Sequence, residues 1–214
     1  MTLKNVYFSM ASFKGNNLYV HGSGSKTGIL LTNLGTPDEP TAPSLKTYLR
    51  QFLSDGRVIE TPKAIWWLIL NGIILNIRPA KSAKNYQSVW TERGSPLLLH
   101  TQKQKELIQN FLNKKYSNLV FDIGMRYGNP SIEKGLNNLR NQNCDRIIVL
   151  PLYPQYCAAT TGSTFDAVSQ ELQKWRWVPS LRFIGSYYDQ PLYIQALKNS
   201  IKDFWSKNEK PTKL

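Results

Sequence analysis

The chain has 214 residues, 41% of them hydrophobic and six of them Trp, which is typical of a folded domain and not of a disordered chain. This length accommodates one α/β domain with a sizeable core, or alternatively two small domains. The formal net charge of +13 favours an anionic partner (nucleic acid, anionic lipid or a small carboxylate), unless it merely reflects a Lys-rich proteome. The two cysteines, Cys144 and Cys157, match no zinc pattern, so a reducing cytoplasm is expected.

The order of apolar and amphipathic segments predicts the fold class. Residues 1–26 lack the apolar segment of a signal peptide and are expected to form a flexible leader. Apolar runs predict strands at residues 28–33, 120–125, 146–150 and 181–185. Helical spacing predicts helices at residues 44–53, 97–115, 131–141, 164–177 and 191–205, with Ser44 as the N-cap of the first. This alternation predicts an α/β fold: a Rossmann-like, parallel four-stranded sheet with flanking helices.

The most apolar stretch is AIWWLILNGIILNI, which runs from Ala64 to Ile77 and is called the apolar segment below. Its 14 residues are fewer than the ~20 that span a bilayer. A buried helix, or a helix docked on a partner, is the expected structure. The alternative is a lip that dips into a membrane, where the basic residues that follow it would suit anionic headgroups.

The carboxyl ends of the predicted strands gather aromatic and polar residues. Ligands of parallel α/β sheets bind at this edge, so these strand ends predict a single cleft. The sequence PLYPQYCAATTGS at residues 151–163 follows the third predicted strand. It carries Tyr153 and Tyr156 where a phosphate-binding loop would carry glycines, and this favours a flat, unsaturated ligand.

Arg126 and Tyr127 directly follow the second predicted strand. Arg126 is placed to hold a carboxylate by a two-pronged hydrogen bond, or alternatively to pair with a neighbouring acid. Tyr127, Tyr153 and Tyr156 could stack on a ligand, or pack the loop onto the sheet.

Residues 160–163 predict a helix N-terminus, where the hydroxyls of Thr160, Thr161 and Ser163 and free backbone N–H groups would bind an anion or simply cap the helix. Leu34 lies in a tight loop after the first predicted strand and is expected to face the cleft. The sequence shows no Ser-His-Asp arrangement, no metal-ligand cluster and no Walker loop.

Six blocks, in this order from residue 27 onward, resemble the ferrochelatase family: TGILLTNLGTP, YLRQFLSD, RPAKSAKNYQSVW, GSPLL, GMRYGNPSI and LPLYPQYCAATTGST. The resemblance implies insertion of ferrous iron into protoporphyrin IX, the last step of haem synthesis. It also implies a chelatase-type fold of two similar halves. Residues 27–209 would form the N-terminal α/β domain, and residues 210–214 would begin a second lobe that this chain otherwise lacks.

The resemblance further implies that Leu34 lies against the macrocycle face and that Arg126 and Tyr127 lie in the porphyrin cleft. The cleft wall would be formed by Tyr153, Tyr156, Thr160, Thr161 and Ser163. The apolar segment would become the lip of the site, with possible peripheral membrane contact. Iron and porphyrin would be substrates and not resident cofactors, no iron–sulfur cluster is expected, and no nucleic-acid partner is expected.

The histidine and glutamate that the resemblance implies for catalysis would lie beyond Leu214, so no catalytic residue or metal ligand is expected in this chain. The expected function is therefore that of a ferrochelatase, with incomplete catalysis by these 214 residues. The alternatives are a non-catalytic porphyrin-binding remnant and, with less support, a basic α/β module that binds nucleic acid.

Overall fold

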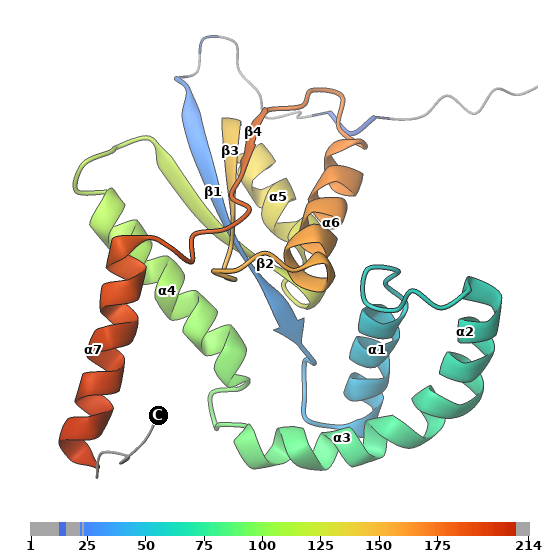
Figure 1. Ribbon diagram of the computed structural model, residues 1–214. Coiled ribbons are helices and arrows are strands. Elements are labelled where there is room, and N and C mark those ends of the chain that lie inside the picture. Colours follow the sequence, from blue (N-terminus) through green and yellow to red (C-terminus); the bar gives the residue numbers. More distant parts are fainter. Residues whose placement is uncertain (1–12, 16–21, 23, 209–214) are drawn as a thin grey trace, which may run out of the picture.

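The computed structural model describes residues 13–15, 22 and 24–208, so most of the expected leader and the expected start of a second lobe lie outside the described residues. A parallel sheet in the order β2-β1-β3-β4 forms the centre of the fold (Figure 1). Its strands are β1 (Lys26–Thr36), β2 (Leu119–Gly128), β3 (Cys144–Pro151) and β4 (Ser180–Phe183). The predicted α/β fold with a parallel four-stranded sheet is confirmed.

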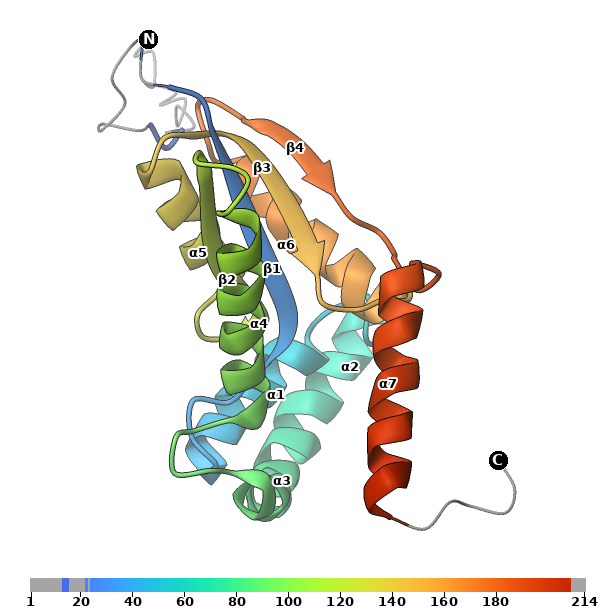
Figure 2. The ribbon, with the colours of Figure 1, turned by 90° about the vertical axis from the view of Figure 1, so that its left-hand side faces the viewer.

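The helices cover both faces of the sheet and its carboxyl edge (Figures 1 and 2). They are α1 (Ala42–Leu53), α2 (Lys63–Ile69), the π-helix η1 (Leu70–Ile74), α3 (Leu75–Val89), α4 (Pro96–Leu112), α5 (Ile132–Asn141), the π-helix η2 (Ala158–Gly162), α6 (Ser163–Leu172) and α7 (Pro191–Lys207). Side chains alternate across a strand. Leu30 of β1 therefore packs with α5 and α6, while its neighbours Ile29 and Leu31 pack with α4.

Helices α1 to α3 form a separate layer beyond the carboxyl ends of the strands (Figure 1). Their core is built from Leu45, Leu49, Leu70 and Leu75, and it includes Tyr127 of β2. Tyr127 is 1% exposed, and its ring lies edge-on to Phe52 with the ring centroids 5.2 Å apart. The last residues of β2 therefore belong to both layers and join them.

The start of α1 differs from the prediction. Helix α1 begins at Ala42 with Thr41 as its N-cap, so the prediction of Ser44 as N-cap is wrong. The Ser44 hydroxyl instead accepts a hydrogen bond from the backbone N–H of Glu39, at 3.0 Å. Pro43 sits in the first turn, where its fixed φ and missing N–H are tolerated.

Helix α6 ends at Leu172, five residues before the predicted end. Trp175 is buried and forms a parallel bridge with Lys14, which lies in the segment expected to be a flexible leader. The Lys14 ammonium also lies 2.9 Å from the carboxylate of buried Glu171. The segment after α6 is therefore held by the backbone bridge to Lys14 and does not continue as helix.

Helix α7 has no buried residue. Its apolar side chains stay open to solvent, and Leu192 is 85% exposed. At its first turn the ring of Tyr193 meets that of Tyr187 edge-on, 5.9 Å between centroids. The backbone N–H of Tyr187 in turn donates to the carbonyl of Pro154, at 2.9 Å.

Gly35 allows the carboxyl ends of β1 and β2 to approach each other closely. Its φ is +104°, and a Cβ added there would lie 1.7 Å from the Tyr127 carbonyl oxygen. We therefore expect Gly35→Ala to lower the free energy of unfolding by about 3 kcal/mol or more, because backbone must shift on both strands. Urea unfolding measures the change. Gly72→Ala is the matched control, because its Cβ would meet nothing within 4 Å; an equal loss in both variants would contradict the prediction.

Candidate functional site

A cleft of about 480 Å³ lies at the carboxyl edge of the sheet, between the end of α1 and the start of α6. Its lining is formed by Asp55, Gly56, Arg57, Glu60, Arg126, Ala158, Asp166 and Gln170. It is called the first cleft below. It lies at the edge where the sequence predicted a binding cleft, because the parallel strands direct the segments after β2 and β3 to the same side.

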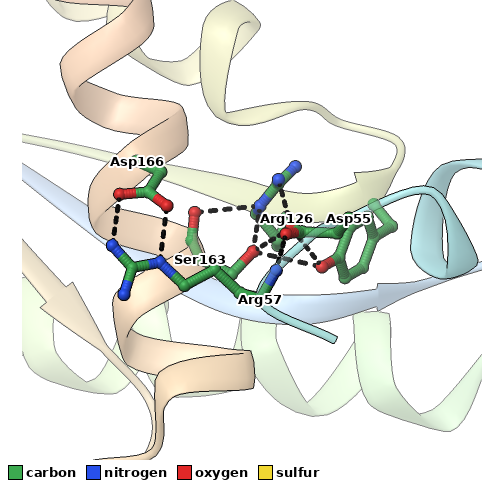
Figure 3. A network of polar contacts seen from close by, with 6 residues as sticks. Asp55, Arg57, Arg126, Ser163 and Asp166 are labelled. Carbon is green, nitrogen blue, oxygen red and sulfur yellow. Dashed lines mark hydrogen bonds and ion pairs between the residues drawn. The ribbon is translucent and has the colours of Figure 1, made fainter. Parts of the chain in front are cut away.

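The Asp55 carboxylate is the centre of a polar network beside the first cleft (Figure 3). Its Oδ2 accepts hydrogen bonds from Arg126 Nη2 at 2.5 Å, from the Tyr127 hydroxyl at 2.7 Å and from the Ser163 hydroxyl at 2.5 Å. Its Oδ1 accepts from the backbone N–H of Arg57, at 2.8 Å. One carboxylate therefore ties together the end of α1, the end of β2 and the start of α6.

The surroundings of Asp55 favour its charged form. Burial alone would raise its pKa, but hydrogen bonds from Ser163, the Arg57 amide and Tyr127, with the charge of Arg126, bring the pKa below its usual range. Burial, aided by the hydrogen bond to Asp55, raises the pKa of Tyr127 to about 12. Asp55 is thus an ionised acceptor, and Tyr127 keeps its proton as a donor.

Arg57 and Asp166, which both line the first cleft, form a second, more exposed contact (Figure 3). Arg57 Nε and Nη2 donate to the two carboxylate oxygens of Asp166, at 2.6 and 2.9 Å. The side chains are 42% and 35% exposed, so water screens this pair. It links the loop after α1 to the first turns of α6.

The structure brings three of the predicted site residues, Arg126, Tyr127 and Ser163, into the Asp55 network. Arg126 pairs with an acid, which was the alternative interpretation of this residue, and its Nε also donates to the Ser163 hydroxyl at 2.6 Å. Nη1 has no hydrogen-bond partner among the described residues. Arg126 therefore meets the first cleft with most of its hydrogen-bonding capacity already used by the protein.

The two loop tyrosines differ in exposure. Tyr156 is 61% exposed, and its hydroxyl lies beside Gly162 and Arg57. Tyr153 is half-buried, and its enclosed hydroxyl has no hydrogen-bond partner among the described residues. Burial raises the pKa of Tyr153. Of the two phenols, Tyr156 is thus the one available to a ligand.

The amides of Thr160, Gly162 and Ser163 are not the free N–H groups that the sequence predicted. The helical turn begins earlier, at Ala158, and the amides of Thr160 and Gly162 both donate to the Cys157 carbonyl at 3.2 Å. Thr161 is buried, and its hydroxyl has no hydrogen-bond partner in the part of the chain that the structure describes. Leu34 is half-buried against the core of α1 to α3.

Sequence reasoning missed Asp55, Arg57 and Asp166. Asp55 lies in the block YLRQFLSD, but nothing in that block indicates which cation it meets. Asp166 was noticed only as part of a helix. The signal that could have found Asp55 and Asp166 was their position: Asp55 lies just after α1 and Asp166 in the first turn of α6, at the edge that carries Arg126.

The apolar segment lies at the surface. Leu70 and Leu75 are buried, so the prediction of a buried helix holds for these two residues only. Its most exposed apolar side chains are Ile65, Trp67, Leu68, Ile73 and Ile77, each more than half exposed. The Asn76 side-chain amide donates to the carbonyls of Asn71 and Gly72 in the π-helix η1, both at 3.0 Å. Within the described part of the chain, no helix has both the length and the apolar character needed to cross a membrane.

We expect Asp55→Asn to lower the free energy of unfolding by about 2–3 kcal/mol near neutral pH, because it leaves Arg126 without a counter-charge. The folded state lowers the pKa of Asp55, so the stability it contributes is lost on acidification. The difference between variant and parent should therefore shrink towards about pH 3. Urea unfolding at both pH values checks this. Asp189→Asn, at an exposed position, is the control; a pH-independent difference would contradict the prediction.

Comparison with known proteins extends these observations. The family model described as Ferrochelatase matches residues 26–214. A ferrochelatase of Thioalkalivibrio sulfidiphilus is 52% identical over 203 residues, which are 94% of this chain and 55% of that protein. A ferrochelatase of Nitrosomonas europaea is 51% identical over 197 residues, 92% of this chain and 54% of the relative. A "Ferrochelatase 2" of Shewanella oneidensis is 52% identical over 194 residues, 91% of this chain and 59% of the relative.

The chain spans about half the length of the curated relatives that it matches. Three of the blocks on which the resemblance rested, those that contain Asp55, Arg126 and Ser163, meet in one hydrogen-bond network. This chain belongs to the ferrochelatase family.

Proposed function

We propose that residues 27–209 form the N-terminal half of a two-lobed chelatase that inserts ferrous iron into protoporphyrin IX and so produces protohaem. The observation that carries the proposal is the ferrochelatase match over residues 26–214, whose blocks converge on one edge of the sheet. The porphyrin is the ligand expected at that edge, beside Leu34 and the loop with Tyr156.

The chemistry of metal insertion fits a rigid, aromatic wall. The flat macrocycle must be distorted so that its nitrogen lone pairs point at the metal, and two pyrrole protons must leave. Close packing against a fixed surface imposes such a distortion. The Asp55 network fixes the end of β2 and the start of α6, while Tyr156 presents an exposed ring. We assign this chain the role of the wall, which the fixed edge and the exposed Tyr156 ring support.

Titration with protoporphyrin IX tests the proposal. The Soret band should shift on addition of the chain, and Tyr156→Ala should weaken binding about fivefold to tenfold through loss of ring stacking. Tyr116→Ala is the matched control: Tyr116 is 54% exposed but precedes β2 at the amino edge. Iron insertion, measured in the same samples, is expected at background. An unshifted Soret band, or equal losses in both variants, would contradict the proposal.

We further propose that iron and porphyrin act as substrates and that the chain holds no iron–sulfur cluster. Cys144 is the first residue of β3 and is buried, whereas Cys157 is exposed in the loop beyond the other end of that strand. The described residues contain no group of three or more His, Cys, Asp or Glu side chains suited to a metal ion. Both cysteines are free, which supports a reducing cytoplasm. Nucleic acid is not an expected partner.

We also propose that the apolar segment makes peripheral contact with a membrane. Trp67 and Leu68 are 62% and 64% exposed, and the exposed basic residues Arg78, Lys81 and Lys84 follow along α3. Apolar side chains flanked by cations are suited to the boundary between headgroups and acyl chains of an anionic bilayer. A poorly water-soluble porphyrin would then reach the site from the lipid.

Sedimentation with phosphatidylcholine vesicles, with and without phosphatidylglycerol, tests the membrane contact. Binding should require the anionic lipid, and Leu68→Ser should weaken it about tenfold because burial of a leucine side chain contributes about 1.5–3 kcal/mol. Leu107→Ser on α4 is the control, since Leu107 is 57% exposed but lies outside the apolar segment. Equal binding of both variants would show that the contact lies elsewhere.

A further inference from the structure

Arg57, in the loop after α1, is held through both its side chain and its backbone (Figure 3). Its guanidinium donates from Nε and Nη2 to the two carboxylate oxygens of Asp166, at 2.6 and 2.9 Å. Its backbone N–H donates to Asp55 Oδ1, at 2.8 Å. A two-pronged contact between planar groups fixes the orientation of the guanidinium as well as its position. Because water screens this exposed pair, it contributes little to stability, and the fixed geometry is its main effect.

Gly162, the last residue of η2, is the place where Arg57 meets the loop that carries Tyr156. A Cβ added to Gly162 would lie 3.3 Å from the Tyr156 hydroxyl, 3.4 Å from Arg57 Nη1 and 3.6 Å from Arg57 Cδ. The two side chains therefore share the space above one glycine. The φ of Gly162 is −64°, an ordinary helical value that any residue adopts, so an added side chain would disturb this shared space and not the backbone.

Arg57 and Tyr156 also interact electrostatically. The hydrogen bonds and the charge of Asp166 raise the pKa of Arg57, and the Tyr156 phenol contributes in the same direction. Arg57 is therefore a cation, and its charge attracts the partially negative phenol oxygen. Nη1 is the guanidinium nitrogen that does not donate to Asp166, and it is the one that lies over Gly162. Arg57 thus offers Tyr156 a fixed, positively charged contact.

The Tyr156 side chain needs such a contact if it is to present a fixed ring. Tyr156 lies in the loop between β3 and η2, and it is 61% exposed. Within the described part of the chain its hydroxyl forms no hydrogen bond. An exposed side chain loses rotamer freedom when a ligand orders it, and a contact that orders it beforehand reduces this cost. The orientation of the ring therefore depends on its neighbours, and Arg57 and Gly162 are two of them.

We propose that Arg57 is a positioning residue for Tyr156. Its guanidinium, fixed by Asp166, supports the phenol and restricts the orientations of the ring before a porphyrin arrives. The ring contacts the ligand, and Arg57 acts through the ring. This inference rests on the proposed function and deepens it, because it specifies how the exposed part of the wall becomes a fixed aromatic surface. The competing possibility is that Arg57 contacts the porphyrin directly, and the experiments below separate the two.

The fluorine NMR spectrum of the chain labelled with fluorotyrosine tests the positioning without any ligand, and Tyr156→Phe identifies the resonance of residue 156. Arg57→Gln and Asp166→Asn should each move this resonance, because the first removes the supporting guanidinium and the second removes its anchor. Gly162→Ala should also move it, since the added methyl group enters the shared space. Arg146→Gln is the matched control, because Arg146 is an exposed, ion-paired arginine near the amino end of β3, and it should leave the resonance unchanged.

A double-mutant cycle with protoporphyrin IX, followed by the Soret shift, tests whether Arg57 acts through the ring. Arg57→Gln alone should weaken binding about threefold, because the ring remains but loses its support. In the Tyr156→Ala background the same change should alter the dissociation constant less than about 1.5-fold, since no ring remains to be positioned. Arg57→Lys keeps the charge but not the planar fork, and should lose about as much as Arg57→Gln.

Asp166→Asn separates positioning from long-range attraction. It makes the chain more positive, which by charge alone would favour an anionic porphyrin. We nevertheless expect it to weaken porphyrin binding, because the guanidinium of Arg57 loses its anchor. Arg146→Gln removes a positive charge without touching the ring, and should change the dissociation constant less than about 1.5-fold because only screened attraction is lost.

The proposal is overturned if the Tyr156 resonance is the same in Arg57→Gln as in the parent chain. It is also overturned if Arg57→Gln weakens porphyrin binding equally with and without the Tyr156 ring, which would make Arg57 a direct porphyrin contact. Urea unfolding verifies that the variants fold, and its midpoint should change little for a screened pair. A moved resonance in a chain that leaves the Soret band unshifted would instead support the positioning of Tyr156 and contradict the proposed function.

Discussion

The Asp55 carboxylate is the contact on which the geometry of the carboxyl edge depends. It lies just after α1 and is held by side chains from β2 and α6, so it connects segments that are more than 70 residues apart. Burying a carboxylate is costly unless charge and hydrogen bonds compensate for it, and Arg126, Tyr127 and Ser163 supply both. The same hydrogen bonds also fix the side chains of Arg126 and Tyr127, because both donate to the Asp55 carboxylate. The edge is therefore a preorganised surface.

The sequence predicted the central sheet well because its signal is local. Parallel strands buried on both faces are continuous apolar runs, and all four predicted runs overlap the strands observed. Positions set by contacts between distant segments were less accessible. The end of α6 could not be predicted because Trp175 is fixed by Lys14, far away in the chain. Arg126 was correctly placed at the edge, but its partner Asp55 could be identified only from the three-dimensional arrangement, since no spacing rule links an acid after a helix to a cation at a strand end.

The chain as a whole has a net charge of +13, but the charged side chains at the carboxyl edge are distributed unevenly. The first cleft is lined by Asp55, Glu60 and Asp166 against Arg57 and Arg126, a formal charge of −1. Another hollow of the surface, where α4 and α5 begin, is lined by Asp38, Arg93 and Lys134 and carries +1. The edge of one sheet therefore offers two electrostatically different environments on a basic protein. Composition indicated that an anionic partner was favourable, but only the pairing of individual side chains shows where cations remain unused.

Helix α7 has a consequence for the dynamics of the chain. A helix with no buried side chain gains little from tertiary packing, and 17 residues of intrinsic propensity give only marginal helicity in water. Its opening should therefore cost far less free energy than global unfolding, and its amide protons should exchange with solvent much faster than those of β1. Within the described residues we therefore expect a cooperative centre, formed around the sheet, and a helix α7 that opens independently of it.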